Sequence, residues 1–253
     1  MDHKIAIITG ATAGIGHETA LLLAENNYNL ILTGRRNDRL ASIKNQIESN
    51  FPAKVYPLHF DIRNRSEVEK ALNSLPEEWR AIDVLVNNAG LAAGLAPVNS
   101  ADLDDWDQMI DTNIKGLLYT SQIISSWMIA RKKGHIINIS SIAGKEAYPN
   151  GSVYCGTKHA VAAITKAMRI ELMPAGIKVS SIAPGAVDTE FSLVRFKGNK
   201  EKADQVYKGF TPLYAKDIAE AILFMITRPA HVNIDDLLIM PTNQASARDF
   251  HRE

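Results

Sequence analysis

A tyrosine and a lysine stand four positions apart in GSVYCGTKHAV, residues 151–161. On a helix, Tyr154 and Lys158 would share one face, so both side chains could point into the same cleft. Free tyrosine titrates near pH ~10, and an adjacent ammonium favours the phenolate, so Lys158 could tune Tyr154 for acid–base chemistry. The same spacing also occurs on ordinary solvated helix faces. The only cysteine, Cys155, lies about 100° further round such a helix and is interpreted as a packing residue.

A serine precedes this pair. Ser141, in NISSIAG, lies thirteen residues before Tyr154 and could donate a hydrogen bond to a substrate carbonyl. The neighbouring Ser140 could do the same, and residue chemistry alone does not separate the two. A hydroxyl donor beside an acid–base tyrosine suits a reaction in which a proton and a hydride move together at a carbonyl or alcohol.

A scaffold must bring these side chains together. Stretches with helical period separate short β-branched runs, which occur at 4–9, 29–33, 54–60, 82–87, 135–140, 177–183 and 237–240. Strands that are apolar on both faces and alternate with helices indicate a parallel sheet covered on both sides. The pattern predicts an α/β, doubly wound Rossmann fold for residues 1–253, as a single domain with a mostly parallel sheet of about seven strands. The first helix is expected to bury Ile15, Thr19, Leu22 and Leu23.

The composition favours a small-molecule partner. The 28 basic and 28 acidic residues cancel, and no basic block points to nucleic acid or an anionic membrane. No apolar run approaches the roughly 18 residues of a membrane span, and the opening MDHKIAIITG does not read as a signal peptide, so a cytoplasmic location is expected. No His/Cys cluster at ligand spacing indicates a metal.

Glycines follow the first expected strand. TGATAGIG, residues 9–16, places Gly10, Gly14 and Gly16 where a helix begins. Glycines there let the backbone turn tightly and approach a pyrophosphate, which the N–H groups of the helix start would bind. They could also serve only as turn and packing residues.

The second expected strand ends in LILTGRRNDRL. An NAD site would carry an acidic residue near this point, but Arg35 and Arg36 stand there instead. Arginine can bind a 2′-phosphate with two hydrogen bonds, so the predicted cofactor is NADP(H). Two alternatives remain: the arginines are solvated loop charges, or Asp38 supports NAD binding.

Two further strand ends lie at the same predicted edge. Asp61 follows the third strand and NNAG, 87–90, ends the fourth. Both would lie beside a dinucleotide bound at the carboxyl edge, although an Asp after a strand is ordinarily a turn former or N-cap.

Six motifs in order, TGATAGIG, NNAG, Asn113 in DTNIKG, Ser141, the Tyr154–Lys158 pair and PGAVDT (184–189), resemble the short-chain dehydrogenase/reductase family over essentially the whole chain. The resemblance implies that Ser141 polarises the substrate carbonyl and that Tyr154 is the general acid or base. It implies that Lys158 holds the nicotinamide ribose and lowers the tyrosine pKa, while Asn113 supports a water linking that lysine to solvent. The cofactor-binding residues would be Gly10, Thr12, Gly14, Ile15, Gly16, Arg35, Arg36, Asp61, Ile62, Asn88, Ala89, Gly90, Tyr154, Lys158, Pro184, Gly185, Val187 and Thr189.

A narrower resemblance lies in TGRRNDRL, DIRNRSEVE, LVNNAGLAAGLAPV, EFSLVRFKG and PAHVNIDDLLIMP. These segments are similar to a subgroup of NADP-dependent 3-hydroxy acid dehydrogenases that also oxidise serine and allo-threonine and reduce malonic semialdehyde. The substrate would contact Ser141 and Tyr154, and its carboxylate would bind Arg195 in the irregular stretch at about 186–212, interpreted as a substrate lid. The stretch could equally be a surface helix pair, and Arg195 an exposed charge.

Two other functions stay open. The chain could reduce other ketones or 3-ketoacyl thioesters, or it could be a regulator that binds NADPH without turnover. Family members usually form tetramers through their long helices, here about 103–131 and 152–173, so a homotetramer is expected. Ile123, Ile124, Ala163 and Ile164 fit that interface and equally fit a core face.

Overall fold

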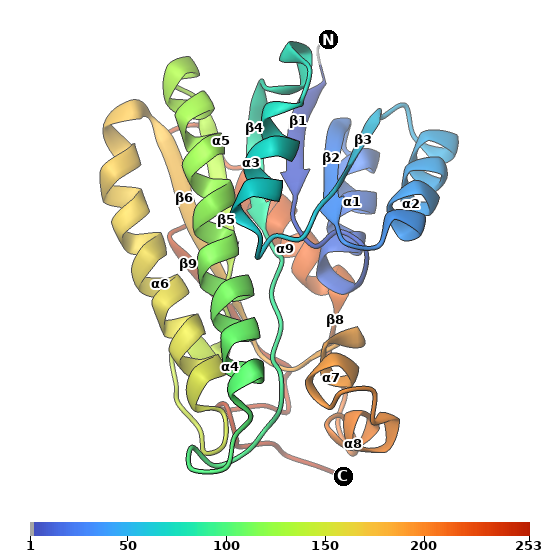
Figure 1. Cartoon of the computed structure of the whole chain (residues 1–253), viewed down its shortest axis with the longest axis vertical. Helices are drawn as coiled ribbons and strands as arrows, with labels where there is room; N and C mark the ends of the chain where they lie inside the picture. Colours follow the sequence, from blue (N-terminus) through green and yellow to red (C-terminus); the bar gives the residue numbers. More distant parts are fainter. Residues whose placement is uncertain (1–2) are drawn as a thin grey trace.

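The computed structural model describes residues 3–253 and contains one seven-stranded sheet in the order β3-β2-β1-β4-β5-β6-β9, with every pairing parallel (Figure 1). The predicted fold class is confirmed, and each expected strand boundary lies within one residue of its observed place. The strands are β1 (Lys4–Ile8), β2 (Tyr28–Gly34), β3 (Val55–His59), β4 (Ile82–Asn87), β5 (Gly134–Ile139), β6 (Ile177–Pro184) and β9 (Asp236–Ile239).

Helices cover both faces of the sheet. Successive residues of a strand face opposite sides, so Ala6 and Ile8 of β1 join one core and Ile5 and Ile7 join the other. The first core packs under α1 (Gly14–Glu25), α2 (Asn37–Asn50) and α9 (Ala215–Ile226). The second packs under α3 (Arg65–Asn73), α5 (Leu117–Arg131) and α6 (Ser152–Leu172). Among the described residues, no helix has the length and apolar character to cross a membrane.

The buried face of α1 differs from the expected one. Thr19 and Leu23 are buried, but Ile15 and Leu22 are only partly buried. The small residues Gly16, Ala20 and Ala24 are buried instead. A Cβ on Gly16 would lie 2.6 Å from the carbonyl oxygen of Gly10, so this face of the helix approaches the preceding loop too closely for larger side chains.

The first of the two expected long helices is interrupted. Residues 103–131 form α4 (Leu103–Ile110), a π-helical turn over Asp111–Gly116, and α5. The second is continuous as α6 and is followed by a 3₁₀ turn, Met173–Ala175. Ile124 is fully buried in the core of the chain itself, which removes it from the residues expected at a subunit interface. Further 3₁₀ turns lie at Glu77–Trp79 and Ile142–Gly144.

The segment interpreted as a lid is partly helical. It consists of β7 (Val187–Asp188), α7 (Glu190–Arg195) and α8 (Lys200–Gln205), and returns through β8 (Leu213–Tyr214), which pairs with β7. In Figure 1, α7 and α8 lie beyond the carboxyl ends of the strands, below α9.

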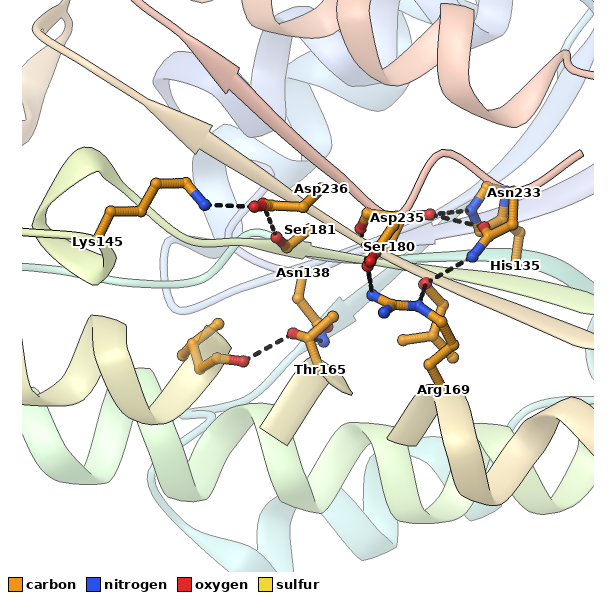
Figure 2. Close-up of polar contacts among 12 residues, drawn as sticks. His135, Asn138, Lys145, Thr165, Arg169, Ser180, Ser181, Asn233, Asp235 and Asp236 are labelled. Carbon is orange, nitrogen blue, oxygen red and sulfur yellow. Dashed lines mark hydrogen bonds and ion pairs between the residues drawn. The ribbon is translucent and has the colours of Figure 1, made fainter. Parts of the chain in front are cut away.

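Polar contacts fasten the edge strand β9 to its neighbours (Figure 2). Asp236 pairs with Lys145 and accepts a hydrogen bond from Ser181, while Asp235 pairs with Arg169 of α6. These contacts fix the end of the sheet beside the loop that follows β5.

Buried beneath that edge, His135 Nε2 lies 2.9 Å from Ser180 Oγ, which donates to Asn233 Oδ1 at 3.0 Å. Because the serine proton goes to Asn233, the contact assigns the Nε2 proton to His135, which then donates to Ser180. Burial lowers the pKa of His135 to about 3, so the ring is neutral. This histidine is therefore a structural donor.

Candidate active site

A cavity of about 550 Å³ opens at the carboxyl ends of the strands. This is the edge where open parallel sheets bind ligands, and the volume is typical of a small-molecule site. Nearly all residues predicted to bind cofactor or substrate line it; the exceptions are Gly16, Asn113 and Arg195. The apolar and polar residues that line it without having been predicted include Phe60, Leu91, Thr112, Ile139, Glu190, Phe191 and Val194.

The glycine-rich loop forms the floor at one end. Gly10 has φ +67°, a left-handed conformation that favours glycine, and a Cβ there would lie 2.9 Å from Ala89 Cα. Asn88 fixes the loop from β4, because its Nδ2 donates to the carbonyl oxygens of Thr9 at 2.9 Å and Gly10 at 3.2 Å. The backbone at the start of α1 is therefore not covered by side chains. A pyrophosphate could approach its N–H groups closely, as such a site requires.

The arginines at the end of β2 take different roles. Arg36 donates through Nε and Nη2 to Thr12 Oγ1 at 3.1 and 2.8 Å, so it is tied to the glycine-rich loop. Arg35 leaves 58% of its side chain exposed, and its nearest acid, Asp61, lies 3.9 Å away. Arg35 thus has guanidinium donors available toward the cavity.

Asp61 lines the cavity but is already paired. Arg63 binds both of its carboxylate oxygens at 2.6–3.0 Å. Although burial opposes it, hydrogen bonding by Arg63 holds the pKa of Asp61 below its usual range. The carboxylate is ionised and neutralised by a partner two residues away.

Ser141, Tyr154 and Lys158 meet at the other end of the cavity. Ser141 follows β5, and its Oγ accepts from the Ala143 N–H at 3.1 Å, which fixes the side chain. Lys158 Nζ donates to the Ile139 carbonyl at 2.9 Å and lies 6.0 Å from the centre of the Tyr154 ring. Tyr154 and Lys158 are both buried and share one face of α6, as their spacing predicts.

Ser140 lies beside Ser141 but faces differently. Its hydroxyl is 3.4 Å from the Lys158 backbone carbonyl, and a Cβ on Gly144 would lie 2.6 Å from it. Ser141, and not Ser140, opposes through hydrogen bonding the rise that burial causes in the pKa of Tyr154. The geometry therefore favours Ser141 over Ser140 as the hydroxyl donor at the reacting centre.

The charges around Tyr154 differ from those expected. Burial raises the pKa of Tyr154, and the Arg195 charge and hydrogen bonding by Ser141 oppose that rise. Burial also lowers the pKa of Lys158 to about 8. Arg195 is the cation whose charge opposes the rise at Tyr154, and the lowering of the tyrosine pKa by Lys158 stays a prediction.

Asn113 lies within the π-helical turn, behind Lys158 and Gly90. Its Oδ1 accepts from the Leu91 N–H, and its Nδ2 donates to the Leu91 carbonyl, both at 2.8 Å. Nδ2 also donates to Thr157 Oγ1 at 3.1 Å. The side chain therefore locks the segment after β4 against α6, and its predicted role in holding a water stays a prediction.

Arg195, in the segment interpreted as a lid, lies over the ring of Tyr154. Its guanidinium lies 4.9 Å from the Tyr154 ring centre and 5.1 Å from that of Phe191, and Nη2 donates to Tyr148 Oη at 3.1 Å. Its Nε belongs to the few buried side-chain atoms, among residues 3–253, with no hydrogen-bond partner. A cation with an unused donor thus lies directly above the tyrosine.

Sequence reasoning missed Arg39, Arg63, Tyr148 and Glu190. Arg63 stands two residues from Asp61, so that local spacing could have indicated the pair. Glu190 binds Arg36 and Arg39 from more than 150 positions away, and no spacing rule predicts such contacts. Across the described residues, no group of three or more His, Cys, Asp or Glu side chains could hold a metal.

Comparison with known proteins agrees with this site. Residues 4–200 match the family model described as short chain dehydrogenase. The chain is 46% identical over 244 residues to an NADP-dependent 3-hydroxy acid dehydrogenase of Salmonella typhi, covering 96% of this chain and 97% of that one. It is 42% identical over 254 residues to the Schizosaccharomyces pombe protein of the same description, covering 100% and 98%.

Solved structures agree as well. The closed form of a serine dehydrogenase complexed with NADP+ superimposes with a TM-score of 0.91 at 43% identity, covering 98% of this chain and 100% of that one. Serine dehydrogenase from Escherichia coli superimposes with a TM-score of 0.83 at 39% identity, covering 95% and 99%. The chain belongs to the short-chain dehydrogenase family. Its similarity to the 3-hydroxy acid and serine dehydrogenases extends over nearly its full length.

Proposed function

We propose that the protein is an NADP(H)-dependent oxidoreductase that interconverts 3-hydroxy acids and 3-oxo acids, with serine, allo-threonine and 3-hydroxypropionate as the substrate type. The observation that carries this proposal is the meeting, in one cavity, of a glycine-rich loop and Arg35 at one end with Ser141, Tyr154 and Lys158 at the other. Arg195 lies above that second end. The full-length relatives support the same activity.

The residues at the loop end fit NADP(H). Gly10 and Gly16 leave no room for a side chain where the backbone must approach a pyrophosphate, and Arg35 offers free donors to a 2′-phosphate. Lys158, with its ammonium buried beneath Tyr154, is suited to hold ribose hydroxyls. When bound, the nicotinamide would supply the hydride acceptor or donor.

During oxidation, Tyr154 removes the proton from the substrate hydroxyl as the hydride leaves the carbon, so alcohol becomes carbonyl. Ser141, which lines the same cavity, donates a hydrogen bond to the same oxygen and holds it against the phenol. During reduction, Tyr154 returns the proton to the carbonyl oxygen. Burial raises the pKa of Tyr154, and the Arg195 charge opposes this rise because it favours the phenolate.

Arg195 also explains a preference for acids. A carboxylate two carbons from the reacting carbon would point away from Tyr154 and toward the lid, where Arg195 lies over the Tyr154 ring. Arginine binds carboxylates with two parallel hydrogen bonds, so Arg195 would orient the substrate as well as hold it. We accordingly propose residues 186–212 as a substrate lid on a single domain.

The proposal is tested by the initial rate of NADP reduction with 3-hydroxypropionate and L-serine, with NAD in parallel. Turnover that depends on NADP is expected, and Arg35→Asp should shift the preference toward NAD. Equal rates with both cofactors would contradict the role of Arg35. Turnover of acyl thioesters and other ketones, but not of free acids, would contradict the substrate class.

The assembly and location stay predictions. We propose a homotetramer, in a cytoplasmic setting, that pairs the outer faces of α5 and α6. Leu118, Ile129 and Ile170 are large apolar residues exposed on these helices. Light scattering of the purified protein tests the tetramer, and a monomeric mass would contradict it.

A further inference from the structure

One carboxylate joins the lid to the cofactor end of the cavity. Glu190, the first residue of α7, accepts a hydrogen bond from Arg36 Nη1 at 2.9 Å through Oε2. Its other oxygen, Oε1, accepts from Arg39 Nη1 at 2.7 Å. Hydrogen bonding by Arg36 lowers the pKa of Glu190, so the carboxylate is charged at neutral pH.

The contact spans the glycine-rich loop. Arg36 also holds Thr12 Oγ1, and a Cβ on Gly14 would lie only 3.2 Å from the Thr189 side chain. Thr12, Gly14, Arg36, Thr189 and Glu190 all line the cavity. The start of the lid, at Thr189 and Glu190, therefore packs on the glycine-rich loop. Arg36 and Arg39, at the end of β2 and the start of α2, hold it there through Glu190.

This fastening does not use up the donors that a 2′-phosphate needs. Arg35 takes no part in it and stays more than half exposed. Arg39 contacts Glu190 through Nη1 and is not among the residues that line the cavity, so the phosphate does not depend on it. A cofactor phosphate and Glu190 can be held at the same time.

A separate anchor holds the far end of α7. Lys197 Nζ pairs with Asp102 at 3.0 Å and Asp105 at 2.9 Å beside α4. The Gly94 N–H donates to the Arg195 carbonyl at 3.0 Å. The lid is therefore fixed on one side and closed by Glu190 on the other.

We propose that Glu190 is a positioning residue that clasps the lid over bound NADP(H), so that the clasp opens whenever the cofactor enters or leaves. This inference rests on the proposed function. The two ion pairs are partly exposed, which makes the clasp weak enough to open during turnover.

The experiment measures release of NADPH from the protein by its fluorescence after mixing with excess NADP. Glu190→Gln should release NADPH about 3- to 10-fold faster, which is the effect expected from losing two partly exposed ion pairs. Glu190→Asp, which keeps the charge, should restore part of the difference. Glu220→Gln is the matched control, because Glu220 forms an exposed pair with Lys216 on α9.

Two further measurements sharpen the test. Arg39→Gln should speed release by less than Glu190→Gln, because the Arg36–Glu190 pair remains, and the double variant should be no faster than Glu190→Gln alone. The affinity for 2′,5′-ADP, which carries the 2′-phosphate but not the nicotinamide half, should change less than about 2-fold in Glu190→Gln.

An unchanged release rate in Glu190→Gln would overturn the clasp. Slower release together with tighter 2′,5′-ADP binding would also overturn it, because Glu190 would then compete with the phosphate. If the unaltered protein binds no NADPH, the proposed function fails and the clasp with it. Normal binding with unchanged release overturns the clasp alone.

Discussion

The guanidinium of Arg195 lies 4.9 Å from the centre of the Tyr154 ring, and its charge opposes the rise that burial causes in the pKa of that tyrosine. A residue of the segment interpreted as a lid thus acts on Tyr154 of α6, the proposed acid–base residue. In the proposed function, Arg195 would link recognition of a substrate acid to the protonation of Tyr154.

Replacing Arg195 with Met should therefore change two quantities. KM for 3-hydroxypropionate should rise by about 10- to 100-fold, since a charge-assisted hydrogen-bonded pair is lost. The basic pKa in the pH profile of oxidation should also move upward, because the cation no longer favours the phenolate. Steady-state rates between pH 6 and 10 measure both.

Arg228→Met is the control for this variant. Arg228 also stacks on an aromatic ring, 4.2 Å from Phe224, but it lies outside the cavity. Its kinetics should match those of the unaltered protein. An unchanged KM in Arg195→Met would refute carboxylate binding by Arg195.

Tyr154→Phe should abolish turnover while leaving the dissociation constant of NADPH within about 2-fold, because the phenol hydroxyl acts on the substrate proton. Fluorescence titration and rate measurements on the same preparation separate the two effects. Substantial remaining activity would remove Tyr154 from its assigned role.

The two adjacent serines provide a matched pair of variants. Ser141→Ala should lower kcat by about 100-fold or more, since it removes a donor to the substrate oxygen. Ser140→Ala should cost less than about 5-fold, because its hydroxyl faces the backbone of α6. The reverse order of effects would reassign the donor to Ser140.

Lys158→Met should stabilise the cofactor-free protein while it destroys activity. Burial lowers the pKa of Lys158 to about 8, so below that pH the folded chain carries the cost of a buried ammonium. Removing it should raise the free energy of unfolding at pH 7 by about 1–3 kcal/mol, after the lost bond to Ile139 is counted.

The pH dependence tests the cause. Between about pH 8 and the unfolded value of 10.5, the unfolded chain binds more protons than the folded chain, so the unaltered protein gains stability as pH rises. The advantage of Lys158→Met should therefore shrink from pH 7 to pH 10 in urea unfolding. A constant difference would point to packing instead of charge.

His135 makes the fold sensitive to acid. Its pKa is lowered to about 3, chiefly by burial. Between about pH 6.5 and pH 3 the unfolded chain therefore binds a proton at His135 that the folded chain does not bind, and acid favours unfolding. Stability should fall by about 1.4 kcal/mol per pH unit between pH 6 and 4 from this group. His135→Gln keeps a donor toward Ser180 and should flatten that fall, measured by urea unfolding.

The exposed His231 supplies the control for the acid experiment. His231→Gln should leave the dependence on pH as it is in the unaltered protein. If the free energy of unfolding falls with decreasing pH equally in His135→Gln and in the unaltered protein, the acid sensitivity comes from the carboxylates and not from His135.

The strands were predictable because β-branched runs and turn residues mark them locally. The shared orientation of Tyr154 and Lys158 was predictable because residues four apart on a helix lie on one face. The buried face of α1 was mispredicted at Ile15 and Leu22, because the contact between Gly16 and Gly10 selects small residues. The partner of Arg36 could not be predicted, since Glu190 reaches it only through the tertiary fold.

The π-helical turn at Asp111–Gly116 makes the length of this segment matter more than its composition. Each α-helical residue turns the helix by about 100°. Deleting one residue would therefore either break the hydrogen bonds between Asn113 and Leu91 or rotate the buried face of α5 away from the sheet. Substitutions along the outer faces of α4 and α5 should be absorbed easily. Single-residue insertions and deletions between 103 and 131 should not, even where every side chain involved faces solvent.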